Sequence, residues 1–341
     1  MYVRRMVRDV TMWAKLVDQL VEAPVVTSFT RIGHDIRSRI GHWPAVSGYD
    51  LAGRVVVLTG ATSGLGLAAA EILARCGATV VLLGRDRSKT VRVRDDLAAR
   101  TGHDELDVVV ADMGDLDAVR DAAGDIRRRY EHVDVLIHNA GALSATRQTY
   151  SDGLEATVAS QVVGPFLLTS LLLDRLTPRQ PGQLPGRVVT MSSGGMYASP
   201  LRVGSLQMGD DYRGSEQYAR AKRAQVTLNE MWADRADPGE VVFHAMHPGW
   251  ADTPGVEASL PRFRRVVGPL LRTPAQGADT LVWLAADDGK PLESSGGFWL
   301  DRERRPIHKL PNTRRSDTPA RRAELWEWCE RMTASDTHPE S

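Results

Sequence analysis

Apolar residues in this chain gather in short β-branched runs, and longer segments whose apolar positions have helical spacing lie between these runs. Each run is long enough for a buried strand of a parallel sheet, which helices cover on both faces. The pattern therefore predicts an α/β fold. The expected strands are residues 54–59, 79–83, 106–111, 133–138, 187–191 and 241–246.

Residues 1–50 precede the first expected strand and have a different character. An apolar stripe predicts one helix that ends before Pro24, and RIGHDIRSRI begins a second helix. Charges interrupt every stretch of about 20 residues, which argues against a transmembrane span, and the segment lacks the uninterrupted apolar core of a signal peptide. Either the helices pack on the main domain, or residues 1–40 attach to a membrane surface. The stripe consists of Met6, Val10, Trp13, Val17 and Leu20.

Three glycines follow the first expected strand and open the apolar helix LGLAAAEILARCG. Gly60, Gly64 and Gly66 allow the backbone to approach a pyrophosphate, which the helix N-terminus receives with free N–H groups and a positive dipole end. A glycine cluster alone is more often a simple turn. Here the strand before it and the helix after it match the requirements of a dinucleotide site.

The second expected strand ends in Gly84, Arg85 and Asp86. Folds that bind NAD usually carry an acidic side chain at this strand end for the ribose 2′-hydroxyl, whereas an arginine there accommodates the 2′-phosphate of NADP. Because Gly84 occupies the acidic position and Arg85 follows it, the sequence favours NADP. If the ribose-binding position lay two residues further along the chain, Asp86 would be the ribose ligand, and Arg85 would then be an ordinary surface arginine.

Tyr218 and Lys222 lie four residues apart in GSEQYARAKRAQVTLNE, which has the pattern of one helix, so they share a helix face. An ammonium stabilises a neighbouring phenolate. A phenol with an ordinary pKa near ~10 then becomes usable as an acid or base closer to neutrality. Alone the pair is a weak signal, because the same spacing arises when a lysine lies over a buried ring.

Polar residues also follow the later strands. The third strand runs into Asp112 and Met113, the fourth runs into Asn139–Gly141, and the fifth is followed by Ser193. Ligands of doubly wound sheets bind at the carboxyl ends of the strands. Ser193 could be a helix cap or a turn residue. In this setting we interpret it as a hydrogen-bond donor to a substrate carbonyl.

Taken in order, these motifs resemble the short-chain dehydrogenase/reductase superfamily, whose signature is T-G-x-x-x-G-x-G, N-A-G, Ser and then Y-x-x-x-K. The resemblance covers about residues 51–310. The stretches SSGGM, HPGWADTPGV and AQGADTLVWLA are similar to the subgroup named dehydrogenase/reductase member 12, which also carries a segment before the fold. The resemblance implies a Rossmann-type, doubly wound, seven-stranded parallel sheet with an N-terminal helical extension.

The resemblance also implies roles for individual residues. It makes Ser193, Tyr218 and Lys222 catalytic, and it gives Lys222 a second role in holding the nicotinamide ribose. The residues that it assigns to the cofactor are Thr59, Gly60, Ser63, Gly64, Leu65, Gly66, Arg85, Asp112, Met113, Asn139, Ala140, Gly141, Tyr218, Lys222, Pro248, Gly249 and Thr253.

Two positions depart from the family pattern. His138 replaces the asparagine before N-A-G, where the side chain is largely structural, and Gln161 stands where the family has its fourth catalytic residue, an asparagine. In the family, the backbone carbonyl of that asparagine holds a water linked to the active-site lysine. Pro165 lacks the N–H that would occupy the Gln161 carbonyl. We therefore predict a bent helix whose Gln161 carbonyl faces Lys222 across one water, or else a kink that only shapes the packing.

The chain divides into an extension (1–50), a cofactor-binding domain (51–310) and a C-terminal helix and tail (311–341). Within the domain, about residues 250–272 should form a lid over the substrate, as in the resembled family, or else two short helices attached by apolar residues. In PARRAELWEWCERM, apolar residues on one side indicate a structural or dimer-contact helix. The lid should place Val256, Leu260, Phe263, Val266, Val267 and Leu270 inside and Arg262, Arg264 and Arg265 outside.

Composition changes this picture little. The 341 residues have a net charge of zero and scattered arginines, so no nucleic-acid patch is expected. Two distant cysteines do not form a secreted disulfide framework, which favours the cytoplasm. His244 and His247 lack nearby cysteine or carboxylate ligands, so no metal site is expected.

The expected function is an NADP-dependent oxidoreductase, a carbonyl reductase or alcohol dehydrogenase acting on a hydrophobic small molecule. The alternative is an NADP-binding sensor or interaction protein that has lost turnover through Gln161. We expect a small-molecule alcohol or carbonyl substrate, no nucleic-acid partner, and a monomer or homo-oligomer. Peripheral membrane contact through residues 1–40 stays open.

Overall fold

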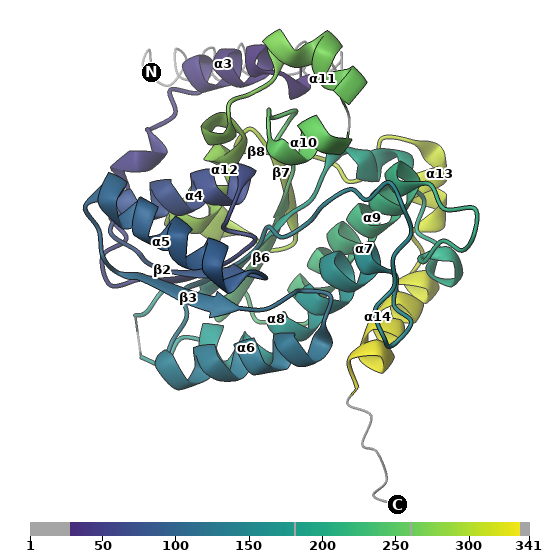
Figure 1. Ribbon diagram of the computed structural model, residues 1–341, viewed down its shortest axis with the longest axis horizontal. Helices are drawn as coiled ribbons and strands as arrows, with labels where there is room; N and C mark the ends of the chain where they lie inside the picture. The colour runs from purple at the N-terminus through teal and green to yellow at the C-terminus, as the bar shows by residue number, and fades with distance from the viewer. Residues whose placement is uncertain (1–27, 181, 260, 335–341) are drawn as a thin grey trace, which may run out of the picture.

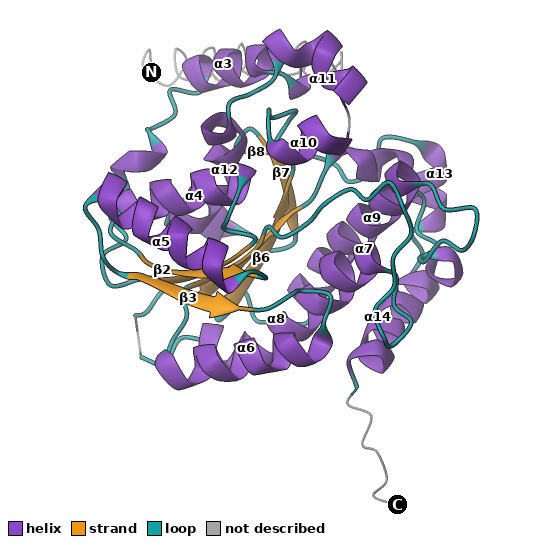
Figure 2. Cartoon of the chain, viewed as in Figure 1, coloured by secondary structure: helices purple, strands orange, loops and turns teal. Residues whose placement is uncertain are grey.

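The computed structural model describes residues 28–180, 182–259 and 261–334, and an eight-stranded sheet forms its centre (Figure 2). The strand order is β3-β2-β1-β4-β5-β6-β7-β8. The first seven strands pair in parallel, as predicted, and the two-residue β8 adds an antiparallel edge. The strands are β1 (Val55–Thr59), β2 (Thr79–Gly84), β3 (Leu106–Val110), β4 (Val135–His138), β5 (Gly186–Met191), β6 (Val241–Met246), β7 (Gly297–Leu300) and β8 (Glu303–Arg304).

Helices cover both faces of the sheet (Figure 1). On one face lie α4 (Gly64–Arg75), α5 (Arg87–Thr101) and α12 (Pro274–Ala286), whose apolar sides form a core cluster with β1 and β2. On the other face, α6 (Leu116–Arg129), α8 (Gly164–Leu176) and α9 (Gly214–Ala233) build a second cluster. Two buried layers explain why the strands between them are mostly apolar.

Side-chain caps fix where several helices begin. Asp115 accepts hydrogen bonds from two backbone N–H groups at the start of α6, and Thr273 and Gln276 form a capping box at the start of α12. Thr318 caps α14 (Pro319–Thr333), which follows α13 (Pro311–Ser316). The remaining short elements are η1 (Val46–Gly48), α7 (Ala156–Val158), η3 (Gly194–Ala198), η4 (Val203–Ser205) and η6 (Lys290–Glu293).

The strand order reverses between β1 and β4, which are adjacent in the sheet although two strands separate them in sequence. At such a switch point the connections leave toward opposite faces, and a crevice opens beyond the carboxyl ends of the strands. Most of the residues predicted to bind the cofactor follow β1 to β4 and therefore lie at this edge of the sheet.

The second helix predicted in the extension is present as α3 (Arg31–Ile40). The residues before it pack on the domain, since Ser28, Phe29 and Thr30 are buried. The apolar stripe from Met6 to Leu20 lies outside the described residues. For the part of the extension that the structure describes, packing on the main domain is therefore the observed arrangement.

The expected lid contains α10 (Pro254–Ser259), α11 (Pro261–Val267) and η5 (Gly268–Leu270). Both helices lie at the end of the molecule where α3 lies (Figure 1). Val266 is 80% exposed, so its predicted place on the inner face is wrong. The inner face of α11 is narrower than predicted, because Phe263 and Val267 are half-buried whereas Val266 lies beside the exposed Arg265, and Arg264 pairs with Asp252.

The C-terminal helix α14 has a structural role. Its Leu325 and Cys329 are fully buried against α9 and its surroundings, and Trp328 and Met332 pack at the edge of the same core. Cys76 is also buried, and both cysteines are free thiols. This burial accounts for the apolar face of α14 without a partner chain.

One continuous helical stretch, Ala156–Leu176, is long and apolar enough to cross a membrane, but 72% of its most apolar window is buried inside the fold. It comprises α7, a distorted turn and α8, and it packs against β4 and β5 in the core. Its apolar character is therefore accounted for by core packing.

Candidate active site

The turn after β1 needs glycine at two kinds of position. Gly60 and Gly64 have φ angles of +68° and +55°, which residues with a side chain rarely adopt. Gly66 is required for lack of space, because a Cβ at this position would lie 2.2 Å from the carbonyl oxygen of Gly60. The turn thus opens α4 with its N–H groups toward the crevice. This is the cradle that a pyrophosphate requires.

Thr59 and Asn139 fasten the ends of β1 and β4 together. The Thr59 hydroxyl accepts hydrogen bonds from the backbone N–H groups of Asn139 and Ala140, at 3.0 and 3.1 Å. The Asn139 amide donates back to the carbonyls of Thr59 and Gly60. Both predicted residues therefore shape the floor of the crevice with groups already engaged inside the protein.

The end of β2 places Arg85 and Asp86 in different surroundings. Asp86 caps α5, accepting hydrogen bonds from the Lys89 N–H and the Ser88 hydroxyl, and these bonds hold the pKa of its carboxyl below the usual range. Arg85 is exposed and makes no hydrogen bond or ion pair with any residue that the structure describes. A Cβ on Gly84 would lie 2.4 Å from the Thr90 hydroxyl, so this position has no room for an acidic side chain.

Asp112, after β3, accepts hydrogen bonds from the backbone N–H of Gly114 and from the Tyr150 hydroxyl at 2.8 Å. This bond, together with burial, raises the pKa of Tyr150, which therefore stays protonated. Met113 is buried. A Cβ on Gly164 would lie 1.9 Å from the Met113 carbonyl oxygen, so a glycine lets α8 approach this strand end.

Ser193 and Tyr218 meet at the centre of the site. Ser193 caps η3 through a 3.2 Å hydrogen bond from the Gly195 N–H, and its side chain is hydrogen-bonded to Tyr218. Burial raises the pKa of Tyr218 to about 12, although the bond to Ser193 acts in the opposite direction. Burial thus shifts this pKa in the direction opposite to the one expected from the neighbouring lysine.

The reason lies in Lys222 itself. Its Nζ is 5.2 Å from the centroid of the Tyr218 ring and donates a 3.0 Å hydrogen bond to the Met191 carbonyl. No carboxylate of the residues that the structure describes is hydrogen-bonded to this ammonium, and burial lowers the pKa of Lys222 to about 7. Near neutrality Lys222 thus exists in both charge states and stabilises a phenolate only weakly.

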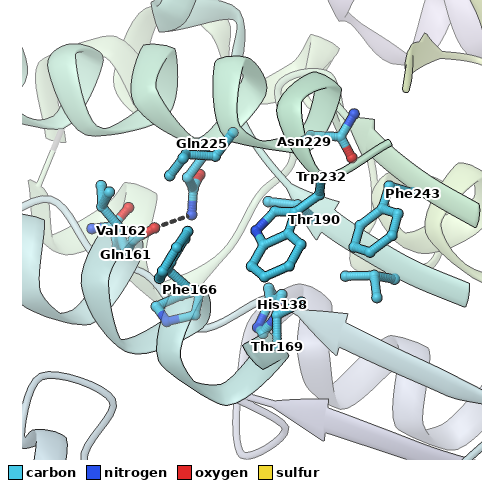
Figure 3. A pocket seen from close by; sticks show the side chains of 13 residues that line it. His138, Gln161, Val162, Phe166, Thr169, Thr190, Gln225, Asn229, Trp232 and Phe243 are labelled. Atoms are coloured by element: carbon cyan, nitrogen blue, oxygen red, sulfur yellow. Dashed lines mark hydrogen bonds between the residues drawn. The ribbon is translucent and has the colours of Figure 1, made fainter. Parts of the chain in front are cut away.

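The helix containing Gln161 is distorted, as predicted from Pro165. Residues Ala159–Val163 form a π-helical turn, η2, before α8 begins. The predicted direction of the Gln161 carbonyl is wrong. This carbonyl accepts a 2.6 Å hydrogen bond from the side-chain amide of Gln225, one helical turn beyond Lys222 (Figure 3). Pro165 has no N–H to bond the Gln161 carbonyl, and the Gln225 side chain of α9 donates to that carbonyl instead.

The side chain of Gln161 points elsewhere. Its Nε2 donates to the Ala142 carbonyl at 2.7 Å, while its Oε1 is buried without a hydrogen-bond partner among the described residues. A Cβ on Gly141 would lie 3.0 Å from this Oε1 and 3.4 Å from Lys222 Nζ. The two polar atoms thus border the same small space beside Gly141.

A cavity lies behind Gln161, between α8, α9 and the sheet (Figure 3). It offers about 30 Å³ to water-sized molecules, which is room for about two waters. His138 borders it and is hydrogen-bonded to the Thr169 hydroxyl at 2.8 Å. Burial lowers the pKa of His138 to about 3, so it is neutral and structural, as expected.

The loop after β6 contributes the last predicted residues. Gly249 has a φ angle of +73°, and a Cβ there would lie 2.2 Å from Arg272 Nε. Thr253 lies against the glycine turn, 3.4 Å from the position that a Cβ on Gly64 would take. Pro248 is half-buried beside them. Ser63 is the N-cap residue of α4, and Leu65 lies in the first turn of that helix and packs toward Gly277 of α12.

Sequence reasoning missed three residues. Gln225 lies three residues after Lys222, so helical spacing puts it near that side of α9, but its contact with Gln161 depends on how α9 packs against η2. Arg272 and Asp301 form a buried pair with hydrogen bonds of 2.6 and 2.8 Å. Nothing in the local sequence links these two residues. Within the described ranges, no three histidine, cysteine or acidic side chains are grouped as metal ligands.

Together these groups can perform a proton transfer beside a dinucleotide cradle. The Tyr218 hydroxyl keeps its proton at neutral pH and is oriented by Ser193, and Lys222 can exchange a proton near pH 7. Arg85 offers an unengaged charge at the end of β2. The site thus combines an acid with an anion-binding crevice.

Comparison with known proteins agrees with this geometry. A family model described as short chain dehydrogenase matches residues 54–262. Dehydrogenase/reductase SDR family member 12 from Bos taurus is 37% identical over 82% of this chain and 86% of its own length. Retinol dehydrogenase 11 from Mus musculus is 30% identical over 77% of this chain and 82% of its own length. A short chain dehydrogenase from Escherichia coli CFT073, complexed with NADPH, superposes with a TM-score of 0.61 over 76% of this chain and all of its own, at 24% identity.

Proposed function

The chain belongs to the short-chain dehydrogenase family and is an NAD(P)-dependent oxidoreductase, and we propose that it reduces a hydrophobic carbonyl compound, or oxidises the corresponding alcohol, with NADP. The observation that carries the proposal is the cluster of Ser193, Tyr218 and Lys222 at the carboxyl end of β5, beside the glycine turn. When bound, the nicotinamide supplies or accepts the hydride.

The residues present fit this cofactor. The segment from Gly60 to Gly66 packs so closely that a Cβ on Gly60 would meet Ala140 and a Cβ on Gly66 would meet the Gly60 carbonyl, and α4 begins there, so its N-terminal N–H groups can receive a pyrophosphate. Arg85 would hold the 2′-phosphate, because it is exposed at the strand end while Asp86 is engaged as a helix cap. The ribose and nicotinamide would lie near Asn139–Gly141 and Lys222.

Tyr218 would transfer the proton. Its pKa of about 12 keeps the hydroxyl protonated at neutral pH, so it is suited to donate a proton to the oxygen of a carbonyl substrate. Ser193, bonded to the same hydroxyl, can donate to the same substrate oxygen. Lys222, with a pKa of about 7, can return a proton to Tyr218. The same groups would accept the proton in the reverse reaction, the oxidation of an alcohol.

Gln161 would supply the acceptor that links Lys222 to solvent. Its backbone carbonyl is bonded to Gln225, but its Oε1 borders the space beside Gly141 that Lys222 also borders. A water in this space could accept from Lys222 and donate to Oε1, which otherwise stays unpaired and costs about 1–3 kcal/mol. In this chain a side-chain oxygen would thus take the place of a main-chain oxygen.

The substrate would be apolar. Val256, Phe263, Val267 and Leu270 of the lid are half-buried and give it an apolar side. A retinol dehydrogenase and a polyprenol dehydrogenase among the relatives, both named for long apolar alcohols, support the same class. We further propose that the protein is cytoplasmic. It would attach to membranes only peripherally, and only if residues 1–40 contact lipid. It would be a homo-oligomer or a monomer.

The alternative function, a sensor without turnover, rests on the replacement of asparagine by Gln161. Oxidation of NADPH in the presence of hydrophobic aldehydes and ketones separates the two. The enzyme should consume NADPH with several of these compounds, and NADH should be used at least tenfold less efficiently. Tight binding of NADPH without consumption by any carbonyl compound in the panel would favour the sensor.

A further inference from the structure

The start of the described chain, Ser28–Thr30, is built into the junction between the lid and the catalytic loop. All three residues are at most 5% exposed. The Phe29 carbonyl accepts a 2.6 Å hydrogen bond from the backbone N–H of Trp250, which begins the lid. The extension therefore contacts the lid at its first hinge through the main chain, which does not depend on a particular side chain.

The second hinge is attached to the same three residues. Arg272 closes the lid, and its guanidinium donates to the carbonyls of Ser28, Phe29 and Thr30 at 3.0, 3.1 and 3.3 Å. The two hinges are also bonded to each other, since the Arg272 N–H donates to the Trp250 carbonyl at 2.8 Å. The extension thus holds both ends of the lid at one point.

A buried carboxylate fixes this point to the sheet. Asp301 follows β7 and binds Arg272 and Arg37 of α3, the latter at 2.7 Å. Asp301 and Arg302 both have φ angles of +55°, an unusual conformation for residues with side chains. Backbone strain of this kind persists where the surroundings determine it strongly. The turn after β7 thus directs Asp301 toward the extension.

Phe29 also joins an aromatic row that leads from the catalytic loop to the lid. Its ring meets His247, after β6, at a centroid distance of 4.3 Å, and Trp250 at 5.7 Å, while Trp250 meets Phe263 of α11 at 5.0 Å. On the other side, a Cβ on Gly194 would lie 2.9 Å from Phe29 Cε2. Phe29 therefore packs directly on the residue that follows Ser193.

From these contacts we infer that Phe29 of the N-terminal extension is a positioning residue, which sets the distance between the lid and the Ser193 loop and so determines which substrates fit. The inference rests on the proposed function for its effect on substrates, but its effect on the lid does not require turnover. We call the hydrogen bonds that join Ser28–Thr30, Arg272 and Asp301 the clamp. Removing the Phe29 ring leaves the clamp in place and deletes the contacts of that ring with Gly194, His247 and Trp250.

The test compares Phe29→Ala with two controls in the full-length chain. Ile32→Ala changes an exposed apolar residue of the same extension, 40% exposed, and Leu325→Ala destabilises the core under α14, away from the lid. The first readout is trypsin cleavage under native conditions, with fragments after Arg264 and Arg265 identified by mass spectrometry. The second is kcat/KM across aldehydes of increasing chain length, together with the Kd of NADP.

Phe29→Ala should be cleaved in the lid at least fivefold faster than the wild type, and neither control should show this change. Its ratio of kcat/KM values for long and short aldehydes should shift at least fivefold, while the Kd of NADP stays within twofold. Phe29→Leu, which retains bulk, should restore most of both properties. The same acceleration of lid cleavage in Leu325→Ala would reduce the effect to general destabilisation and overturn the inference.

Unchanged lid cleavage in Phe29→Ala would overturn the inference as well. If no variant and no wild-type protein turns over any aldehyde, the proposed function fails. The cleavage rates still decide whether Phe29 positions the lid. If the enzyme is active and lid cleavage changes while the ratio of kcat/KM values does not, Phe29 does not determine which substrates fit.

Discussion

The backbone carbonyl of Gln161 accepts a 2.6 Å hydrogen bond from the side-chain amide of Gln225. Gln161 is 1% exposed and Gln225 is 5% exposed, so neither group has ready access to bulk water. Pro165 creates the vacancy that Gln225 fills, since it has no N–H for this carbonyl. The bond joins the π-helical turn to α9, the helix that carries Tyr218 and Lys222.

Gln225→Leu should leave that carbonyl without a donor and reduce the free energy of unfolding by about 1–3 kcal/mol, the cost of a buried unsatisfied acceptor. Urea unfolding of the variant and the wild type measures the difference. Gln207→Leu is the control, because Gln207 also bonds a backbone group, the Glu155 N–H, but is more exposed. Equal losses in the two variants would contradict a special role for the buried bond.

Gln161→Met should lower kcat about tenfold or more while the Kd of NADP changes less than twofold. The substitution keeps the length of the side chain and removes the Oε1 that borders the space beside Lys222. If this oxygen holds a water that donates or accepts protons, solvent exchange with Lys222 becomes slower. Steady-state kinetics with a fixed aldehyde gives kcat. An unchanged kcat would exclude the side-chain oxygen from the relay.

Arg85→Ala should weaken NADP binding by roughly 10- to 100-fold and NAD binding by less than threefold. The reason is the loss of charge-assisted hydrogen bonds to the 2′-phosphate, worth about 1.5–3 kcal/mol in general. Titration with both cofactors, followed by tryptophan fluorescence, measures the two affinities. Arg87→Ala, two residues along and equally exposed, serves as the control. Parallel losses for NADP and NAD would remove Arg85 from the phosphate site.

The lowered pKa of Lys222 has a consequence for stability. In the unfolded chain this lysine takes up its proton near pH 10.5, and in the folded protein near pH 7. Between these values the unfolded state binds more protons, so the free energy of unfolding should rise as the pH rises. From pH 7 to 8.5 the gain should be on the order of 1–2 kcal/mol.

Urea unfolding at pH 7 and pH 8.5 tests this dependence, with Lys222→Met as the comparison. The variant has no proton to lose at this position and should lack the gain. A wild-type protein and a variant that change in parallel over this pH range would show that Lys222 has an ordinary pKa in the fold.

Asp301→Asn should reduce the free energy of unfolding by about 3–5 kcal/mol, because two buried guanidinium groups, Arg37 and Arg272, lose their common counter-charge. Asp117→Asn removes a surface partner of Arg120 that is 93% exposed and should cost less than about 1 kcal/mol. Thermal and urea denaturation compare the two. Similar small losses would mean that the clamp contributes little to the folded state.

The first six strands were predictable from sequence because they face helices on both sides and are mostly apolar, with few polar exceptions such as the buried Arg187 and His244. The seventh strand was expected only from the family resemblance, which implies seven strands. The glycine turn and the pair Tyr218 and Lys222 were predictable because their spacing follows directly from local geometry. The two-residue β8 carries no pattern of its own, since both of its residues are exposed. It was therefore not foreseen.

Other features depend on contacts between distant parts of the chain. The kink near Pro165 was a local property and was predicted, but the donor that bonds the free Gln161 carbonyl is Gln225 of α9, a distant part of the chain. The pKa of Tyr218 depended on how deeply both it and Lys222 are buried, which helical spacing does not give. The bond between Arg272 and Asp301, and the place of Phe29 against Gly194, arise only when the extension packs on the domain.

The most direct test of the central claim is the rate of hydride transfer in Tyr218→Phe, measured in a single turnover with NADPH and an aldehyde that the wild type reduces. The phenylalanine ring keeps the packing around Lys222 and removes only the hydroxyl that bonds Ser193. The account predicts a fall of at least 100-fold in this rate, with the Kd of NADPH within threefold of the wild-type value. A rate within threefold of the wild type would show that Tyr218 is not the proton donor and would contradict the account.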